Sequence, residues 1–382
     1  MFPARFLPVA GAALLLAGCS QPLPQGSARG QVPIPPSTLS LMSVKGMQPS
    51  DPILIRAYKK ESEMEVWKRG TNGRYALLKT YPICRWSGQL GPKVTQGDRQ
   101  APEGFYAVSP AQMNPNSAYY LSFDTGFPNA YDRSQGRSGS ALMVHGNCSS
   151  AGCYAMTDEA IAEIYAMARE SLAGGQRAFQ FQAYPFRMTA ENMAKYREDR
   201  NFAFWRNLKE GSDRFEATGE EPQVAVATGR YRFQISPEGE AVAARKIAQD
   251  EHRYAALVGS TPAIRTAYAD GASHPSFQGM LSGERLDVSR PEALASAGQD
   301  VPVSASTPLV WVAEARAKAA GRLPLAEAQG NAELTARSRP APGRGPQPAP
   351  TQVASARIAS PPPAPVDERP FYSRWLGNLF RS

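Results

Sequence analysis

The sequence predicts an α+β fold that is mainly β, with a strand-rich core, a few flanking helices and disordered tethers at both ends. Three observations support this prediction. The first half of the central region alternates as paired strands do, and its second half carries helical patterns. Both ends are rich in Pro, Gly, Ala and Ser. The central region, from roughly Leu39 to Phe233, is long enough to bury a good core as one domain.

Strands are predicted from short alternating or apolar runs that are bounded by turn-forming residues. Four such runs lie in the first part of the domain, at Pro52–Tyr58, Glu63–Lys68, Tyr75–Tyr81 and Ala141–His145. Phe179–Ala183 alternates in the same way and stops before Pro185. The last strand of the domain is either Gln223–Thr228 or Arg230–Gln234.

Helices are predicted in the second half. Thr157 is a suitable N-cap, and the two acidic residues after it lie where the helix dipole favours negative charge. This helix is predicted to end at Gly174. Glu191–Lys209 is predicted to be a second helix, and residues 240–256 a third that joins the domain to the C-terminal region.

The N-terminus predicts export and a lipid anchor. Residues 1–18 combine a basic side chain, an apolar run from Phe6 to Ala17 and small residues, as secretory signal peptides do. That run is shorter than the about 20 residues that cross a bilayer. Leu16–Cys19 resembles the bacterial lipoprotein processing box, which implies lipidation of Cys19, and Ser20 favours the outer membrane. The alternative is a plain signal peptide with a chance cysteine. We expect a lipid-anchored protein on the periplasmic side of the cell envelope.

The remaining segments are predicted to be connectors. Residues 19–40 are a Pro/Gly/Ser-rich tether, residues 237–290 a helical extension and linker, and residues 291–382 an Ala/Pro/Arg-rich, largely disordered tail. The net charge is +8. In an envelope this charge favours lipid headgroups and cell-wall carboxylates, and no nucleic-acid motif accompanies it, so no nucleic-acid partner is predicted.

One His and two Cys lie close together, between His145 and Cys153, in a chain with 3 His and 4 Cys. A zinc set of Cys84, His145, Cys148 and Cys153 lacks the paired C-x₂-C spacing of structural zinc sites, and thiols are vulnerable to oxidation outside the cytoplasm. We expect no metal. A Cys148–Cys153 or Cys84–Cys148 disulfide is common in secreted proteins and stays open as an alternative.

A catalytic pair accounts for more of these residues. A strand that ends at His145 brings the imidazole to the rim of a sheet, and the loop Gly146–Gly152 returns the chain so that Cys153 lies beside it. The small residues of the loop allow backbone N–H groups to point at one spot, as an oxyanion hole requires. A neighbouring His lowers the pKa of a thiol and holds the thiolate, which is the attacking species.

This segment resembles the catalytic motif of the YkuD-type L,D-transpeptidases, in which an upstream His precedes a Ser/Thr-His-Gly-Cys block. Ser150–Cys153 matches the block at Ser, Gly and Cys, and His145 matches the upstream His. Ala101–Tyr106 resembles the family's TP-x-G-x-F/Y segment. Further runs resemble the branch of the peptidoglycan meso-diaminopimelic acid protein amidase, which cuts a lipoprotein off peptidoglycan: Gly126–Arg133, Gly136–Arg137, Cys153–Asp158 and Pro185–Thr189.

The resemblance covers about residues 50–235 and implies a β-rich catalytic domain over residues 41–236. The sequence departs from the ordinary family in three places. Ala151 replaces the His of the block, the His145–Cys153 spacing of eight is short, and Ala155 stands where Asn or Arg is frequent. The motif asks for no sulfur at Cys148, so a disulfide there is expected to be dispensable.

The resemblance implies acyl transfer at meso-diaminopimelate of peptidoglycan stem peptides. Cys153 is the nucleophile, His145 the general base and acid, and the backbone N–H groups of Gly152 and Cys153 hold the oxyanion. The thioacyl-enzyme passes its acyl group to an amine, or to water with release of a wall-linked protein. This chemistry needs no cofactor, and none is predicted. The expected partners are stem peptides, a wall-attached lipoprotein, and the membrane through Cys19.

The candidate substrate-binding residues are Ser150, Arg133, Arg137, Arg187 and Tyr131. A guanidinium pairs well with a carboxylate, although each arginine alone is more often structural or solvated, and Tyr131 is more often part of the core or of the site wall. The other class of function is a non-catalytic envelope lipoprotein that binds the cell wall through a decayed domain. The intact pair His145 and Cys153 argues against decay. The sequence does not predict an oligomeric state.

Overall fold

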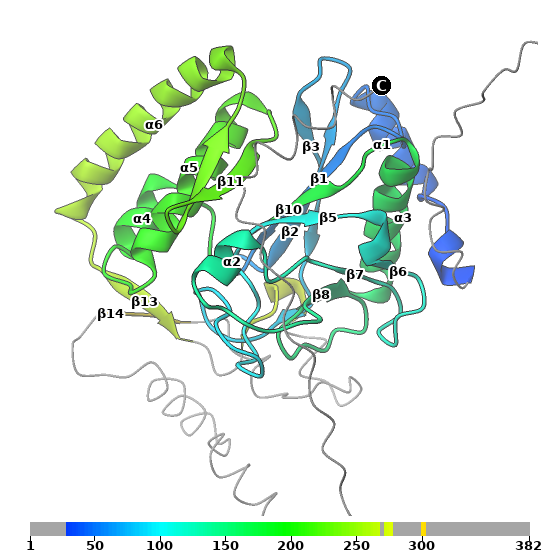
Figure 1. The fold of residues 1–382 in the computed structure, drawn as a ribbon, viewed down its shortest axis with the longest axis horizontal. Helices are drawn as coiled ribbons and strands as arrows, with labels where there is room; N and C mark the ends of the chain where they lie inside the picture. Colours follow the sequence, from blue (N-terminus) through cyan, green and yellow to red (C-terminus); the bar gives the residue numbers. More distant parts are fainter. Residues whose placement is uncertain (1–27, 268–270, 278–298, 303–382) are drawn as a thin grey trace, which may run out of the picture. The chain divides into compact units, whose positions relative to one another are not determined.

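The computed structural model describes residues 28–267, 271–277 and 299–302. Two five-stranded sheets form its centre (Figure 1). The first sheet has the order β3 (Tyr75–Pro82), β2 (Glu63–Arg69), β1 (Ile53–Tyr58), β10 (Phe179–Tyr184) and β5 (Gly104–Val108). The second has the order β4 (Arg85–Trp86), β9 (Tyr154–Ala155), β8 (Met143–His145), β7 (Ser122–Asp124) and β6 (Met113–Asn114). Together with the flanking helices, these sheets confirm the predicted α+β, mainly β class.

The first sheet is covered on both faces, and this explains why every residue of β1 is buried. Residues alternate between the two faces of a strand. Ile53 and Ile55 therefore face the main core, whereas Leu54 packs with Phe215 of α5 (Phe202–Thr218). β1 runs antiparallel to β2 and parallel to β10.

The predicted strands of the first half are all present, as β1, β2, β3 and β8, and Phe179–Ala183 lies in β10. Both alternatives for the last strand form, as β11 (Gln223–Ala227) and β12 (Arg230–Gln234). They pair as a hairpin through a two-residue turn, in which Thr228 and Gly229 have φ of 50° and 68°. Positive φ at both central residues suits the twist of a hairpin.

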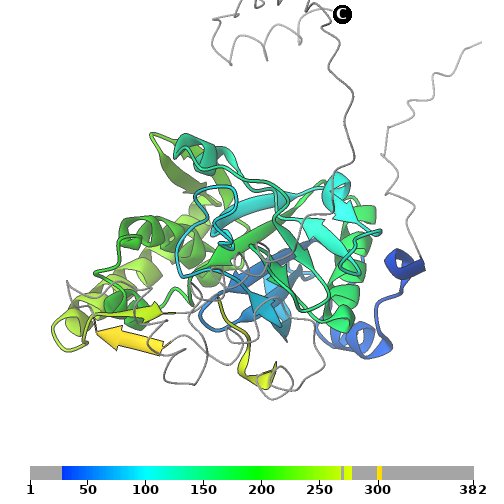
Figure 2. The same cartoon turned by 90° about the horizontal axis from the view of Figure 1, so that it is seen from below.

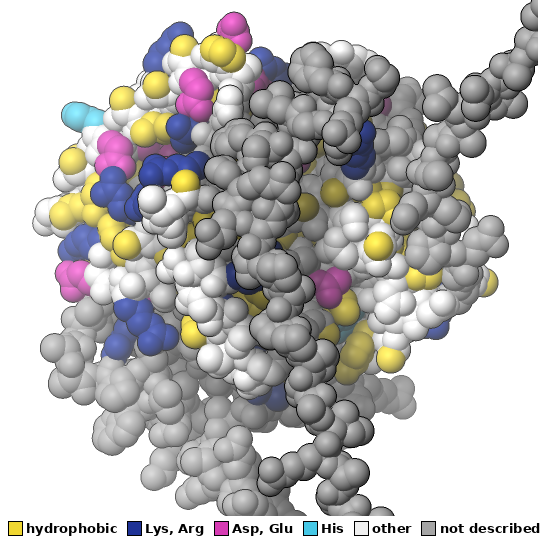
Figure 3. Space-filling view, viewed as in Figure 1, with side chains coloured by type: hydrophobic (Ala, Val, Ile, Leu, Met, Phe, Trp, Pro, Cys, Tyr) yellow, Lys and Arg dark blue, Asp and Glu magenta, His cyan; other side chains and the backbone are white. Residues whose placement is uncertain are grey.

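Further helices pack around the sheets and around α5. The predicted helix after Thr157 is α3 (Asp158–Ala173), and the Thr157 hydroxyl accepts the N–H of Ala160 at 3.2 Å. The predicted C-terminal helix is α6 (Pro237–Val258), which packs on α5 and on α4 (Ala190–Lys195). Acidic and basic side chains mix over this face (Figure 3), with ion pairs such as Arg206–Glu251. None of the helices within the described residues is long and apolar enough to cross a membrane.

The prediction of one helix over Glu191–Lys209 was wrong, because the chain breaks between α4 and α5. The Asp199 carboxylate accepts the backbone N–H of Asn201 at 2.8 Å and its side-chain amide at 3.0 Å. Short polar side chains that bond to nearby backbone compete with a continuing helix. Asn201 then stands at the N-cap position of α5.

The segment before the domain is structured where a tether was expected. Within the predicted tether 19–40, residues 28–40 contain η1 (Ala28–Gln31) and most of α1 (Pro36–Val44). Arg169 of α3 donates to the carbonyls of Gly30 and Val32 at 2.6 and 3.0 Å. Ile34 is buried in the main core. A Pro/Gly-rich segment can therefore be ordered here, because its free carbonyls and its few apolar side chains find partners on the domain.

The C-terminal extension returns to the second sheet. Ala272 forms a bridge with Trp86 of β4, the edge strand of that sheet. Four residues of the predicted tail, β14 (Gln299–Pro302), pair with β13 (Ile264–Ala267). The predicted signal peptide 1–18, Cys19 and the rest of the tail 291–382 lie outside the described residues.

Candidate active site

The second sheet brings the two catalytic candidates onto neighbouring strands. β8 and β9 are parallel, with Val144 opposite Tyr154 and His145 opposite Ala155. The same register sets Cys153 beside Met143, whose backbone N–H donates to Sγ of Cys153 at 3.4 Å. The spacings of regular strands then put the Cα atoms of His145 and Cys153 about 8 Å apart, which side chains can bridge. The predicted strand–loop–nucleophile arrangement is therefore present.

The imidazole of His145 is set up as a neutral base. Its Nδ1 lies 2.6 Å from the carbonyl oxygen of Gly146. A carbonyl can only accept, so Nδ1 carries the proton and Nε2 keeps a free lone pair. Burial lowers the pKa of His145 below its ordinary value, and the bond to Gly146 only partly opposes this. The side chain is 3% exposed. At neutral pH the ring is therefore uncharged and able to accept a proton.

The thiol of Cys153 is protonated at rest, contrary to the expected thiolate. Burial raises the pKa of Cys153, and the negative charge of Asp124 adds to this, while the Met143 N–H and the positive charge of Lys93 oppose it less. A neutral His145 supplies no positive charge that would stabilise a thiolate. Among the described residues, the thiol's hydrogen bonds go to the backbone of Met143 and to the carbonyl of Ala141, and none joins it to the imidazole. The pair is thus Cys–SH and neutral His before substrate binds.

The nucleophile loop, Gly146–Gly152, is fastened by a disulfide between Cys84 and Cys148. This answers the open alternatives: Cys148 pairs with Cys84, and Cys153 keeps a free thiol. The disulfide also takes two of the four ligands of the zinc hypothesis, and no cluster that could hold a metal ion occurs in the described part of the chain. Cys148 has a positive φ of 42°, and its N–H donates to the carbonyl of Met156 at 3.3 Å.

The hydroxyl of Ser150, a predicted substrate-binding candidate, forms hydrogen bonds within this loop. Ser150 is 2% exposed, and its hydroxyl donates to the carbonyl of Cys153 at 2.7 Å. The same oxygen accepts the N–H of Cys153 at 3.1 Å and that of Gly152 at 3.4 Å. Both predicted oxyanion donors are therefore engaged in this conformation. Because the Gly152 bond is the longer one, this N–H is the easier of the two to release to a substrate oxygen.

A buried ion pair supports the loop from the other side. Lys59 and Glu103 lie 3.0 Å apart, and both side chains are fully buried. Lys59 donates to the carbonyl of Gly91 at 2.8 Å, and Glu103 accepts the N–H of Gly91 at 2.7 Å. The segment that contains Gly91 begins at Ser87, whose hydroxyl lies 3.1 Å from that of Ser150. Hydrogen bonds thus connect this ion pair, through the chain around Gly91, to the backbone of the nucleophile.

Two of the predicted carboxylate clamps have partners within the protein. Arg137 forms an ion pair with the buried Asp132 at 2.9 Å and stacks on Tyr131 and Phe204. Arg133 lies exposed on α2 (Ala130–Ser134) and donates to the carbonyl of Pro128. Tyr131 is a core residue, stacked on Tyr231 with ring centroids 4.3 Å apart.

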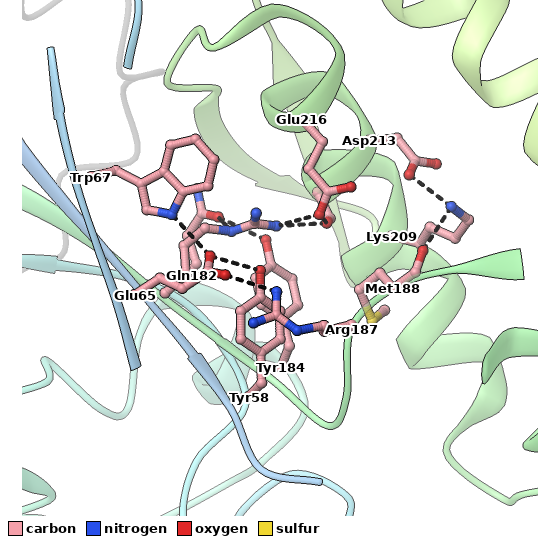
Figure 4. Close-up of polar contacts among 12 residues, drawn as sticks. Tyr58, Glu65, Trp67, Gln182, Tyr184, Arg187, Met188, Lys209, Asp213 and Glu216 are labelled. Atoms are coloured by element: carbon pink, nitrogen blue, oxygen red, sulfur yellow. Dashed lines mark hydrogen bonds and ion pairs between the residues drawn. The ribbon is translucent and has the colours of Figure 1, made fainter. Parts of the chain in front are cut away.

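The third clamp, Arg187, belongs to a polar layer between the first sheet and α5 (Figure 4). It pairs with Glu65 at 2.7 Å and with Glu63, and it stacks on Tyr58. In the same layer, Arg56 pairs with Glu216 of α5 at 3.0 Å. Internal carboxylates and aromatic rings hold the guanidinium groups of Arg137 and Arg187, so the geometry does not favour these two as clamps for a substrate carboxylate. The guanidinium of Arg133 is exposed and bonds to a backbone carbonyl.

The sequence reasoning missed Tyr119. Its ring lies on the imidazole of His145, with centroids 4.7 Å apart, and its carbonyl accepts the N–H of Gly146 at 3.0 Å. The local signal was only a pair of tyrosines between two short strands, which does not identify their partner.

Comparisons with known proteins cover the part of the chain that carries this site. The model of the YkuD family, described as the L,D-transpeptidase catalytic domain, matches residues 52–174, from β1 to the end of α3. Two proteins named "Putative L,D-transpeptidase YafK", from Escherichia coli K12 and from strain O157:H7, are each 46% identical over 180 residues. Each alignment covers 47% of this chain and 73% of the relative.

Similarity to solved structures is much weaker. The helical cell shape determining protein Pgp2 from Campylobacter jejuni aligns with 15% identity and a TM-score of 0.29, over 60% of this chain and 80% of that one. Bd1075 from Bdellovibrio bacteriovorus aligns with 13% identity and a TM-score of 0.27, over 47% of this chain and 78% of that one.

Proposed function

The chain belongs to the L,D-transpeptidase family of enzymes, which act on peptidoglycan, and from this premise we propose that it cleaves an acyl bond at meso-diaminopimelate of stem peptides through Cys153. One observation carries the proposal. A protonated thiol and a neutral imidazole with a free Nε2 lie on neighbouring strands, at the sequence positions that the family motif assigns to nucleophile and base.

The chemistry follows from this protonation state. Nε2 of His145 accepts the thiol proton as Sγ of Cys153 attacks the carbonyl carbon at the L-centre of diaminopimelate. The C–N bond then breaks, and His145 returns the proton to the leaving amine, so that a thioester remains. Water or a second amine attacks the thioester and loses its proton to His145, and the thiol is regenerated. When the leaving amine belongs to a wall-linked protein, that protein is released as the thioester forms, and attack by water then frees the stem peptide from Cys153. Attack by a second amine forms a new link instead.

The test uses intact sacculi that carry covalently bound lipoprotein. We expect the wild-type protein to remove the protein remnant from muropeptides, read by mass, and we expect Cys153→Ala not to. Adding a D-amino acid as a competing amine distinguishes the two outcomes, because transfer adds its mass to the product and hydrolysis does not. Unchanged muropeptides would refute the substrate assignment if a carbapenem-like probe still acylates Cys153 in the same preparation.

We also propose that the protein is lipid-anchored through Cys19, on the strength of the processing-box resemblance at Leu16–Cys19. Buried acyl methylenes each contribute about 0.8 kcal/mol, so several chains on one cysteine hold firmly. Cys19→Ala is expected to move the protein out of the outer-membrane fraction, into the soluble fraction or onto the inner membrane through an uncleaved signal. Fractionation with immunodetection measures this, and unchanged outer-membrane association would contradict lipidation.

A further inference from the structure

Tyr119 covers the imidazole of His145. The two rings are in contact, with centroids 4.7 Å apart, and are tilted by 37° to one another. Tyr119 is 47% exposed, whereas His145 is 3% exposed. A large aromatic ring that is half in solvent therefore separates the imidazole from water on this side.

The backbone of the same residue also fixes the imidazole. The N–H of Gly146 donates to the carbonyl of Tyr119 at 3.0 Å, and the carbonyl of Gly146 accepts the Nδ1 proton of His145 at 2.6 Å. A side chain at Gly146 would meet the Tyr119 carbonyl at 3.0 Å and Asp158 at 2.5 Å, so this close approach requires glycine. Tyr119 thus limits both the orientation of the imidazole, through the contact between the rings, and its tautomer, through Gly146.

The loop Pro115–Leu121, which carries Tyr119, is held from outside by the N-terminal segment Ala28–Ile34. Figures 1 and 2 show η1 beside the end of β6, where this loop begins. Gly30 lies so close to Pro115 that a Cβ there would come within 2.6 Å of the proline Cβ. The guanidinium of Arg29 lies over the ring of Tyr120, 5.4 Å from its centroid. This segment lies outside residues 52–174, the part of the chain that the family model matches.

We propose that Tyr119 is a positioning residue for His145 and that the segment Ala28–Ile34 braces the loop that carries it. The proposal rests on the proposed role of His145 as the base. The segment that follows the predicted lipid anchor is then part of the catalytic apparatus and not a passive tether.

Exclusion of water is the physical consequence of this arrangement. Burial is the main cause of the lowered pKa of His145. The charged side chains on the elements around the ring are Asp158 at the start of α3, which accepts the N–H of Asn147, Asp124 on β7, and Arg29 over Tyr120. Removing the Tyr119 ring exposes the imidazole, so the pKa of His145 rises towards the ordinary value of about 6.5. The base is then protonated at a higher pH.

The test compares Tyr119→Ala with Tyr119→Phe in the full chain. For Tyr119→Ala we expect kcat to fall by about 10- to 100-fold through misplacement of the base. We expect the acid limb of kcat/KM to move to higher pH and the melting temperature to change little, because the ring is half exposed. Tyr119→Phe keeps the ring that contacts the imidazole and is expected to restore both values. A wild-type acid limb in a folded Tyr119→Ala variant would overturn the proposal.

A second readout does not depend on turnover. The His145 ring proton, identified by its absence in His145→Ala, is titrated by NMR in the wild type, Tyr119→Ala and Gly30→Leu. We expect the midpoint to rise in both variants, and Val44→Ala, at an exposed position of α1, serves as the control. An unchanged titration midpoint of His145 in a folded Gly30→Leu variant would show that the segment Ala28–Ile34 does not support the loop of Tyr119. Shifted midpoints without any wild-type turnover would instead refute the proposed function and leave the positioning contact intact.

Discussion

Cys153→Ala is expected to abolish turnover on peptidoglycan while leaving the domain folded. Without Sγ there is no route to the thioester, so the loss is complete within detection. The thiol is a weak structural element: it accepts one N–H at 3.4 Å and lies 3.8 Å from a carbonyl. Its removal should therefore change the melting temperature by only a few degrees. Muropeptide release and thermal melting measure the two effects, and residual turnover at a tenth of the wild-type rate would exclude Cys153 as the nucleophile.

His145→Ala is expected to come close to the same loss at neutral pH. Burial raises the pKa of Cys153, so the thiol stays protonated unless a base removes its proton. In this variant the remaining rate should rise steadily with pH, as the thiol ionises by itself. The wild type should instead keep its activity to below the ordinary histidine pKa of about 6.5, because the pKa of His145 is lowered and the base stays neutral there. Identical pH profiles for the two proteins would contradict the role of the imidazole.

The sequence could place the candidate pair His145 and Cys153 together because its geometry is local. β8, a loop of small residues, Cys153 and β9 lie within thirteen consecutive residues, 143–155, and the parallel pairing of β8 and β9 brings the two side chains to neighbouring strands. The fold class followed from alternation, which depends only on which face of each strand is buried. The strand and helix cores were therefore found, and the error came at the break near Asn201, where side-chain hydrogen bonds end a helix despite a continuing pattern.

The roles of the residues around the pair depend on contacts between distant segments, which could not be predicted from the sequence. Arg187 meets Glu65, which lies 122 positions away, so its availability to a substrate could not be judged from composition. Ser150 matched a motif, yet its hydroxyl is turned inward by the N–H groups of its own loop. Tyr119 was missed because the sequence around an aromatic loop residue does not indicate which histidine its ring contacts.

The disulfide gives the largest expected change in stability. It closes a loop between Cys84 and Cys148, 64 residues apart, and in the chain-entropy account such a loop stabilises by about 4 kcal/mol. For a domain of this size, that corresponds to a melting temperature lower by roughly 10 °C. Cys84 is fully buried beside Phe277, so Cys84→Ser also leaves a hydroxyl in an apolar place. Cys148, expected to be dispensable from the family motif, is therefore predicted to matter for stability.

Cys148→Ser is expected to lower the activity as well as the stability, because the disulfide that it removes holds the loop between His145 and Cys153. The melting temperatures of Cys84→Ser, Cys148→Ser and the double variant should agree within a few degrees, since each variant lacks the same single bond. Reductant should lower the melting temperature of the wild type towards theirs. Cys153→Ala, which keeps the disulfide, is the matched control and should remain sensitive to reductant. If Cys148→Ser melts like the wild type, the disulfide contributes nothing to the fold, and hydrogen bonds such as those of Ser150 and of the Met156 carbonyl hold the nucleophile loop.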